Sequence, residues 1–248
     1  MAKFVILDTE TTGTGEGDRI IQLGYIVLEP RKETKVFSEF CLPDTQISYG
    51  AMEVHHITPE MIEDKAPCVE TDAFHQLNLL NTPDNYMIIH NAPFDLNMLS
   101  KEGFECKMEL IDTLRCARHV YDDEEAHRLQ FFRYKMGLYK DEQKEAEKLG
   151  IEVKAHDAIG DVLTLKLFLT KLRKTVEEKY PGSSPIEKMV ELTKEPVFFK
   201  KPMRFGKHKG KTLVEIAAED SGYLRWMLKS MENLDEDMKY SIEKVLAV

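Results

Sequence analysis

An apolar run near the N-terminus, Phe4 to Leu7, ends in two acidic residues, Asp8 and Glu10. The run predicts a buried strand, and alternate residues of a strand point to the same face of a sheet, so the two carboxylates should project together. Residues 11–13, Thr-Thr-Gly, predict a turn of small residues that a substrate backbone could approach closely. We therefore expect the function of the chain to depend on carboxylates presented by a sheet.

Composition limits the classes of protein that this chain can belong to. Its 248 residues suffice for one large core, or for one domain with an appendage. The four cysteines lack zinc-type spacing, which predicts reduced thiols in a cytoplasmic protein without disulfides or zinc. We expect neither a signal peptide nor a membrane span. The net charge of −10 argues against a globally basic nucleic-acid binder, so a polyanionic partner must meet local basic patches or bound cations.

The periodicity of the sequence predicts an α/β fold. Three strands at 4–8, 20–28 and 35–40 should form an antiparallel meander, and shorter strands are expected at 86–89 and 108–111. Helices are predicted at 58–64, 69–80, 94–101, 127–135, 141–149 and 157–179, with a further helix after a capping Asp112.

The C-terminal region predicts a second unit. Prolines and a Gly-Ser-Ser run interrupt the periodicity after residue 180, so we expect a domain at 1–180, a linker at 181–202 and a small helical module at 203–248. The module contains a basic loop, residues 205–211, and helical patterns at 213–219, 223–231 and 235–245. We expect Trp226 to anchor its core rather than to serve as a stacking platform for a base.

Four acidic residues and one histidine form the candidate catalytic set. Asp95 falls in the first turn of a predicted helix, and His156 and Asp161 fall at the start of the longest one. Carboxylates suit Mg²⁺ or Mn²⁺, and two such ions can hold the attacking and leaving oxygens of a phosphodiester in line. The predicted ligands are Asp8, Glu10, Asp95 and Asp161. His156 is the predicted general base, because an imidazole with a pKa near 6.5 accepts protons at cellular pH.

Three segments in this order, 8–13, 90–95 and 156–161, resemble the motifs of the DEDDh exonucleases. This family includes the proofreading subunit of bacterial replicative polymerases, ribonuclease T and oligoribonuclease. The resemblance implies a ribonuclease H-like mixed sheet flanked by helices, two Mg²⁺ ions that Mn²⁺ could replace, and release of 5′-mononucleotides from 3′ ends. Segments 51–58, 117–121, 205–211 and 220–226 also resemble one member of the family, so the similarity spans nearly the whole chain.

Further side chains are expected to contact the substrate, namely Thr9, Thr11, Thr12, His55, Asn91, Phe94, Lys207, Lys209 and Lys211. Phe94 could stack on a terminal base, although core packing explains an aromatic residue there equally well. The three lysines, together with glycine amides of the same loop, could bind DNA phosphates, although charge runs are usually only solvated.

The leading hypothesis is a 3′-to-5′ exodeoxyribonuclease that acts on single-stranded 3′ ends and on duplex ends, and the resemblance implies a role in DNA repair or recombination. An RNA-trimming exonuclease is an alternative, because the metal chemistry does not distinguish the two sugars. A second alternative is a proofreading or adaptor subunit whose C-terminal module docks on a polymerase.

Overall fold

The computed structural model describes residues 1–151, 157–231 and 234–247, which form two compact units. The N-terminal unit comprises Met1–Val120 and Glu124–Thr193, and the C-terminal unit comprises Tyr121–Asp123 and Lys194–Val248. Each unit has its own hydrophobic core.

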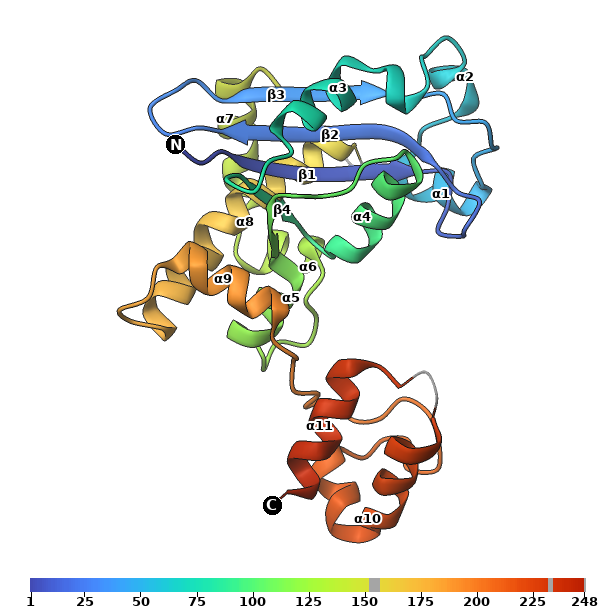
Figure 1. Ribbon diagram of the computed structural model, residues 1–248, viewed down its shortest axis with the longest axis vertical. Helices are drawn as coiled ribbons and strands as arrows, with labels where there is room; N and C mark the ends of the chain where they lie inside the picture. The colour runs from blue at the N-terminus through green and yellow to red at the C-terminus, as the bar shows by residue number, and fades with distance from the viewer. Residues whose placement is uncertain (152–156, 232–233, 248) are drawn as a thin grey trace. The chain divides into compact units, whose positions relative to one another are not determined.

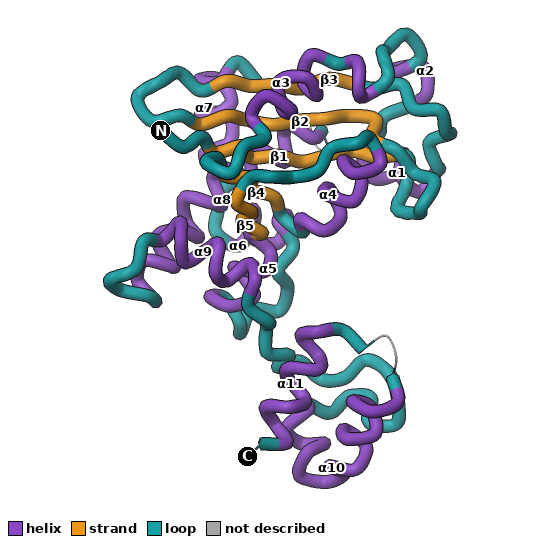
Figure 2. Tube along the Cα trace, viewed as in Figure 1, coloured by secondary structure: helices purple, strands orange, loops and turns teal. Residues whose placement is uncertain are grey.

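A five-stranded mixed sheet forms the centre of the N-terminal unit (Figure 2). Its strands are β1 (Phe4–Thr11), β2 (Ile20–Leu28), β3 (Lys35–Phe40), β4 (Tyr86–Ile89) and β5 (Glu109–Asp112), in the order β3-β2-β1-β4-β5. The first three strands pair antiparallel, and β4 joins β1 and β5 in parallel. The predicted mixed sheet flanked by helices is confirmed, and β1 continues three residues beyond its predicted end.

Helices connect and cover the strands (Figure 1). In the N-terminal unit they are α1 (Tyr49–His55), α2 (Pro59–Ile62), α3 (Asp72–Leu80), α4 (Ala92–Lys101), α5 (Thr113–Val120), α6 (Leu129–Lys135), α7 (Tyr139–Leu149), α8 (Ala158–Lys179) and α9 (Pro185–Lys194). The sequence did not predict α1, which begins where the side chain of Ser48 accepts a hydrogen bond from the amide of Ala51. Among the described helices, none is long and apolar enough to cross a membrane.

Alternation along β1 and β2 gives the sheet two different faces. Val5, Leu7 and Tyr25 belong to the main core cluster, which also contains buried side chains of α3 and α4. The Tyr25 hydroxyl donates to the carbonyl of Ala73, at 2.7 Å, and so joins this face to α3, which crosses in front of the sheet in Figure 1. Asp8 and Glu10 have the opposite parity, so they point away from this core.

Helix α8 lies on the carboxylate face, against a glycine of β2. Gly24 pairs with Asp8 across the β1–β2 ladder. A Cβ atom at Gly24 would lie 2.9 Å from both the Cβ of Ala158 and the amide nitrogen of Ile159. Real side chains do not approach so closely, so the missing side chain at Gly24 allows the first turn of α8 to rest directly on the sheet beside Asp8.

The predicted linker at 181–202 is partly wrong, because α9 occupies most of its first half. Met189 and Thr193 of α9 are buried, and the Thr193 hydroxyl accepts a hydrogen bond from the amide of Asp112, at 2.9 Å. The proline that suggested a break, Pro185, is the first residue of the helix, where a missing N–H costs nothing.

The C-terminal unit contains α10 (Leu213–Ser230) and α11 (Glu236–Leu246) around a small apolar core. Helix α10 joins the two helices predicted at 213–219 and 223–231, with a non-helical residue, Asp220, between them. The prediction that Trp226 anchors this core is wrong, because its side chain is 52% exposed. Its neighbours Leu224 and Met227 fill the core instead.

Replacing Gly24 with alanine should destabilise the protein, because the new methyl group would press against the backbone of α8. We expect a loss of about 1–3 kcal/mol in the free energy of unfolding, the usual cost of overpacking, measured by urea denaturation. Gly50→Ala is the matched control, because Gly50 lies in α1 with no atom within 4 Å of an added Cβ. Equal stability of the two variants would contradict the close packing at Gly24.

Candidate active site

Three of the four predicted ligands lie together in the structure. Asp8 and Glu10 project from the same face of β1, and Asp161 lies in the first turn of α8. One ligand oxygen from each lies within 4.8 Å of the other two, and all three side chains are partly exposed. This carboxylate cluster is open to solvent and could hold a divalent cation.

Asp95, the fourth predicted ligand, is held at the edge of β1 by Thr9. Its Oδ1 accepts hydrogen bonds from the Thr9 amide, at 3.0 Å, and from the Thr9 hydroxyl, at 2.8 Å. Strand β4 pairs only with Phe4, Val5 and Ile6 of β1. Beyond Ile6, the carboxylate of Asp95 accepts a hydrogen bond from a β1 amide that a longer β4 would have bonded. Because β4 is short, Asp95 can reach β1 at Thr9, the residue between Asp8 and Glu10 in the sequence.

Burial and neighbouring acidic groups raise the pKa values of Asp8, Glu10 and Asp95. Burial first, and then the charges of Asp95, Asp161 and Glu10, hold the pKa of Asp8 well above its ordinary value. Burial, followed by the charges of Asp161 and Asp95, raises the pKa of Glu10 to about 8. Burial raises the pKa of Asp95 to about 7, although its hydrogen bonds from Thr9 act in the opposite direction. Without a counter-charge, the site therefore favours protonated carboxyl groups near neutral pH.

Two glutamine side chains position the first turn of α8, and the sequence patterns predict neither role. Gln22, paired with Glu10 across the sheet, accepts a hydrogen bond from the Ala158 amide, at 3.1 Å, and donates one to Asp157. Gln130 donates to Oδ1 of Asp161, at 2.8 Å. A buried amide in an otherwise apolar strand, as at Gln22, is the sequence signal that could have identified such a role.

Asp112 fixes the loop that leads to Asp95. This buried carboxylate accepts hydrogen bonds from the amides of Asn91 and Ala92 at the start of α4, at 3.1 and 3.2 Å. It also accepts one from the amide of Leu114 at the start of α5, at 2.9 Å. The predicted capping role of Asp112 thus serves two helices. Asn91 itself is exposed with a left-handed backbone, φ 80° and ψ 51°.

The threonine hydroxyls at the end of β1 and just after it bond within the chain. Thr11 donates to the carbonyl of Gly13, at 2.7 Å, and Thr12 donates to the carboxylate of Asp18, also at 2.7 Å. A Cβ at Gly13 would lie 2.7 Å from an oxygen of that carboxylate. The small residue expected to admit a substrate backbone therefore also makes room for Asp18.

The side chain of His55 is buried and that of Phe94 is partly buried, although both were expected to contact the substrate. The Nδ1 atom of His55 accepts a hydrogen bond from the amide of Ile57, at 2.9 Å, so its Nε2 is the donor to the carbonyl of Thr11, at 3.2 Å. Phe94 is half-buried against the main core. His55 thus bonds the end of β1, and Phe94 packs on the core from α4.

The predicted lysines lie in the basic loop of the C-terminal unit, and two of them form ion pairs there. Lys207 contacts Asp220 at 2.8 Å, and Lys211 pairs with Glu219. Lys209 is exposed, and within the described part of the chain it forms no ion pair with an acidic residue. Lys209 is thus the lysine of this loop best placed to meet an added phosphate. His156, the predicted base, lies outside the described residues.

Three crowded, partly exposed carboxylates at the end of a strand in a mixed sheet match the ligand chemistry of a metal-dependent nuclease. The family model described as exonuclease matches residues 5–168, two thirds of the chain, and includes the four acids and His156. The chain therefore belongs to this exonuclease family and is an enzyme that hydrolyses phosphodiester bonds. A second model, exodeoxyribonuclease X-like C-terminal, matches residues 203–232.

Known members of the family resemble the chain over different lengths. Exodeoxyribonuclease 10 of Escherichia coli is 27% identical over 97% of both proteins. The 3′-5′ exonuclease DinG of Bacillus subtilis is 29% identical over 75% of this chain and 19% of its own length. A solved structure of exonuclease X in complex with 5′ overhanging duplex DNA is 25% identical, with a TM-score of 0.53 over 78% of this chain and 99% of that one. The resemblance that the tail motifs suggested is confirmed.

The raised pKa values predict a pH-dependent stability for the metal-free protein. The pKa of Glu10 is about 8 in the folded chain and near 4.5 when unfolded, so ionisation of this group disfavours the folded state. In EDTA, the free energy of unfolding should increase as the pH is lowered from about 8 toward about 5, as measured by urea denaturation. Added divalent cations should raise stability most at the higher pH, because they favour the ionised carboxylates.

Glu10→Gln tests the source of this pH dependence, because an amide of nearly the same shape cannot ionise. The metal-free variant should be more stable than the parent protein at the higher pH, and its stability should change less with pH. A parent protein that is equally stable in EDTA at both pH values would exclude the proposed repulsion.

Proposed function

We propose that the protein is a 3′-to-5′ exodeoxyribonuclease that releases 5′-mononucleotides from DNA ends in DNA repair or recombination. The observation that carries this proposal is the carboxylate cluster of Asp8, Glu10 and Asp161 beside Asp95. The choice of DNA is supported by a relative named exodeoxyribonuclease that aligns over 97% of both proteins, C-terminal unit included. The proposed enzyme prefers a single-stranded 3′ end as its substrate and also accepts duplex ends.

The donor set suits two Mg²⁺ ions, which Mn²⁺ could replace, because hard cations prefer carboxylate oxygens. Asp8, Glu10, Asp95 and Asp161 would hold them. When bound, such ions neutralise phosphate charge and lower the pKa of a water molecule. The crowding of the carboxylates supports this assignment, since their mutual repulsion is relieved by positive charge.

The protein contributes positioning and proton transfer. Thr9 orients Asp95 through two hydrogen bonds, and Gln130 orients Asp161 through one. In the proposed reaction, neutral His156 accepts a proton from the attacking water. This assignment of His156 rests on its position five residues before Asp161 and on the DEDDh motif.

A time course on 5′-labelled DNA and RNA strands of one sequence, in Mg²⁺, tests the proposal. We expect a ladder of DNA products that shortens from the 3′ end. Asp8→Ala should abolish it, because a ligand is lost from the cluster. Asp95→Asn should reduce it strongly while keeping the fold, because an amide oxygen can still accept the bonds from Thr9.

The same gel separates the other hypotheses. Cleavage of RNA alone would replace the DNA assignment with an RNA-trimming one. Cleavage that survives both substitutions would remove the carboxylate cluster from the mechanism.

The lysines of the basic loop are proposed to contribute phosphate contacts. Replacing Lys207, Lys209 and Lys211 with alanine should weaken DNA binding and flatten its dependence on salt, measured by fluorescence anisotropy in EDTA. Each lost single-strand phosphate contact lowers the salt slope by about 0.7, so the triple variant should lose up to about 2. Lys209→Ala alone should account for about 0.7 of this. Lys239→Ala, an exposed lysine on α11, is the charge-matched control, and an unchanged slope in the triple variant would refute the assignment.

A further inference from the structure

Three aromatic rings form a row on the C-terminal unit. The ring centroid of Tyr223 lies 4.8 Å from that of His208, with the planes near perpendicular, and 5.6 Å from that of Trp226. Trp226 is the only tryptophan of the chain and is 52% exposed. The row therefore begins inside the unit at His208 and ends at the surface with a large flat side chain.

The helix that carries this row already has a complete apolar face. Leu224 and Met227 of α10 are buried in the core of the C-terminal unit. Tyr223 and Trp226 lie three residues apart on the adjacent stripe of the same helix. Exposing an indole ring in this way leaves a large apolar area in water, although the core of the unit is filled without it.

The basic loop contains His208 of this aromatic row and lies beside Tyr223. Gly206 has a φ of +76°, and a Cβ there would lie 2.4 Å from the hydroxyl of Tyr223, so only glycine fits. Lys207 and His208 both contact the carboxylate of Asp220, at 2.8 and 3.0 Å. These contacts fix the loop beside Tyr223, and the loop and the row form one surface.

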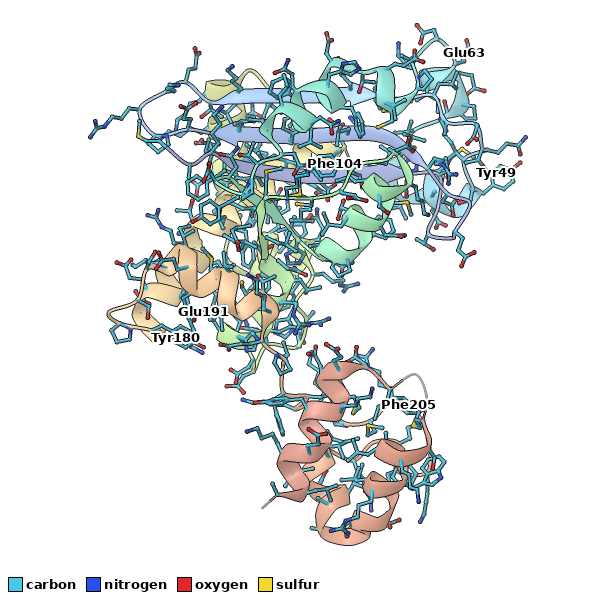
Figure 3. The ribbon with its side chains drawn as sticks, in the orientation of Figure 1. Tyr49, Glu63, Phe104, Tyr180, Glu191 and Phe205 are labelled. Atoms are coloured by element: carbon cyan, nitrogen blue, oxygen red, sulfur yellow. The ribbon has the colours of Figure 1, made fainter. Side chains whose placement is uncertain are left out.

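The charge of this region differs from that of the rest of the chain. Residues 194–248 contain eleven lysines and arginines and nine aspartates and glutamates, whereas the whole chain carries a net charge of −10. Arg204, Lys209 and Arg225 are exposed; the first two lie in or next to the basic loop, and the third precedes Trp226 in the sequence. Phe205, labelled in Figure 3, adds a second aromatic side chain that is 48% exposed. Positive groups and exposed aromatic rings thus occur together in an otherwise acidic protein.

We propose that this surface, formed by Phe205, Tyr223 and Trp226 with Arg204 and Lys209, binds single-stranded nucleic acid through an unpaired base stacked on Trp226. Aromatic rings bind any base through its flat face, and nearby cations bind the backbone, which together give sequence-tolerant binding of single strands. Paired bases in a duplex do not offer that face. The inference rests on the proposed function only for the choice of DNA, because the chemistry of the surface is the same for either sugar.

The surface is separate in chemistry from the carboxylate cluster. Its proposed contacts, base stacking and cation–phosphate attraction, require no metal ion. Its role is to retain a strand by its bases, in addition to the phosphate contacts proposed for the lysines. A nucleic-acid strand held in this way would remain bound to the protein between successive cleavage steps.

The test uses the intrinsic fluorescence of Trp226 in the full-length protein, in EDTA so that no strand is cleaved. A poly-thymidine oligonucleotide should quench this fluorescence, and an abasic strand with the same number of phosphates should not. In anisotropy measurements with labelled poly-thymidine, Trp226→Ala should bind about tenfold more weakly, as expected for the loss of one stacked base. Val214→Ala, on the exposed face of the same helix, is the control and should bind as the parent does.

Equal binding of the abasic and normal strands, or unchanged affinity in Trp226→Ala, would overturn the proposal in favour of charge alone. Equal quenching by duplex and single strands would overturn it too. A polymerase retained by the parent protein after nuclease treatment, and lost in Trp226→Ala, would instead assign the surface to a protein partner. Cleavage of DNA in Mg²⁺ is read separately, so loss of stacking with normal cleavage refutes only this inference.

Discussion

The direct contact between Gly24 and the first turn of α8 is the packing constraint on which the site depends. The distance between a sheet and a helix is usually set by the side chains that pack between them. At this point the sheet contributes no side chain, because the residue is Gly24. Asp161 is carried toward Asp8 and Glu10 because its helix starts at this contact. The position of Asp161 in the carboxylate cluster thus depends on the missing side chain of Gly24 on the neighbouring strand.

This packing brings together groups that repel one another. Burial and the neighbouring carboxylates raise the pKa values of Asp8 and Glu10. The fold keeps the site in place through hydrogen bonds at its periphery: the Gln22 amide holds the start of α8, and the Asp112 carboxylate holds the starts of α4 and α5. Such neutral or peripheral supports let a protein retain a strained electrostatic arrangement that its function requires.

Much of the fold and part of the site followed from local patterns. The five strands and the pairing of Asp8 with Glu10 were predictable because a two-residue alternation determines which side chains share a face. The roles of Gln22 and Gly24 were not, because they depend on contacts with residues more than a hundred positions away.

Two further errors have related causes. The prolines after residue 180 were interpreted as helix breakers, whereas Pro185 begins α9. Trp226 was assigned to a core because it is large and apolar, and hydrophobicity alone does not distinguish the inward stripe of a helix from the adjacent one. In both cases the residue type alone does not determine the local structure, because the outcome depends on the tertiary contacts that the residue makes.

The early end of β4 has a consequence for how this sheet can vary. Because β4 pairs only as far as Ile6, the part of β1 that follows has no partner among the described strands on this side, and the buried carboxylate of Asp95 takes the Thr9 amide there. Sheet edges normally tolerate insertions and attract foreign strands. This one can accept neither, so the length of the connection from Ile89 to Asp95 is set as strictly as the identity of the acid at its end.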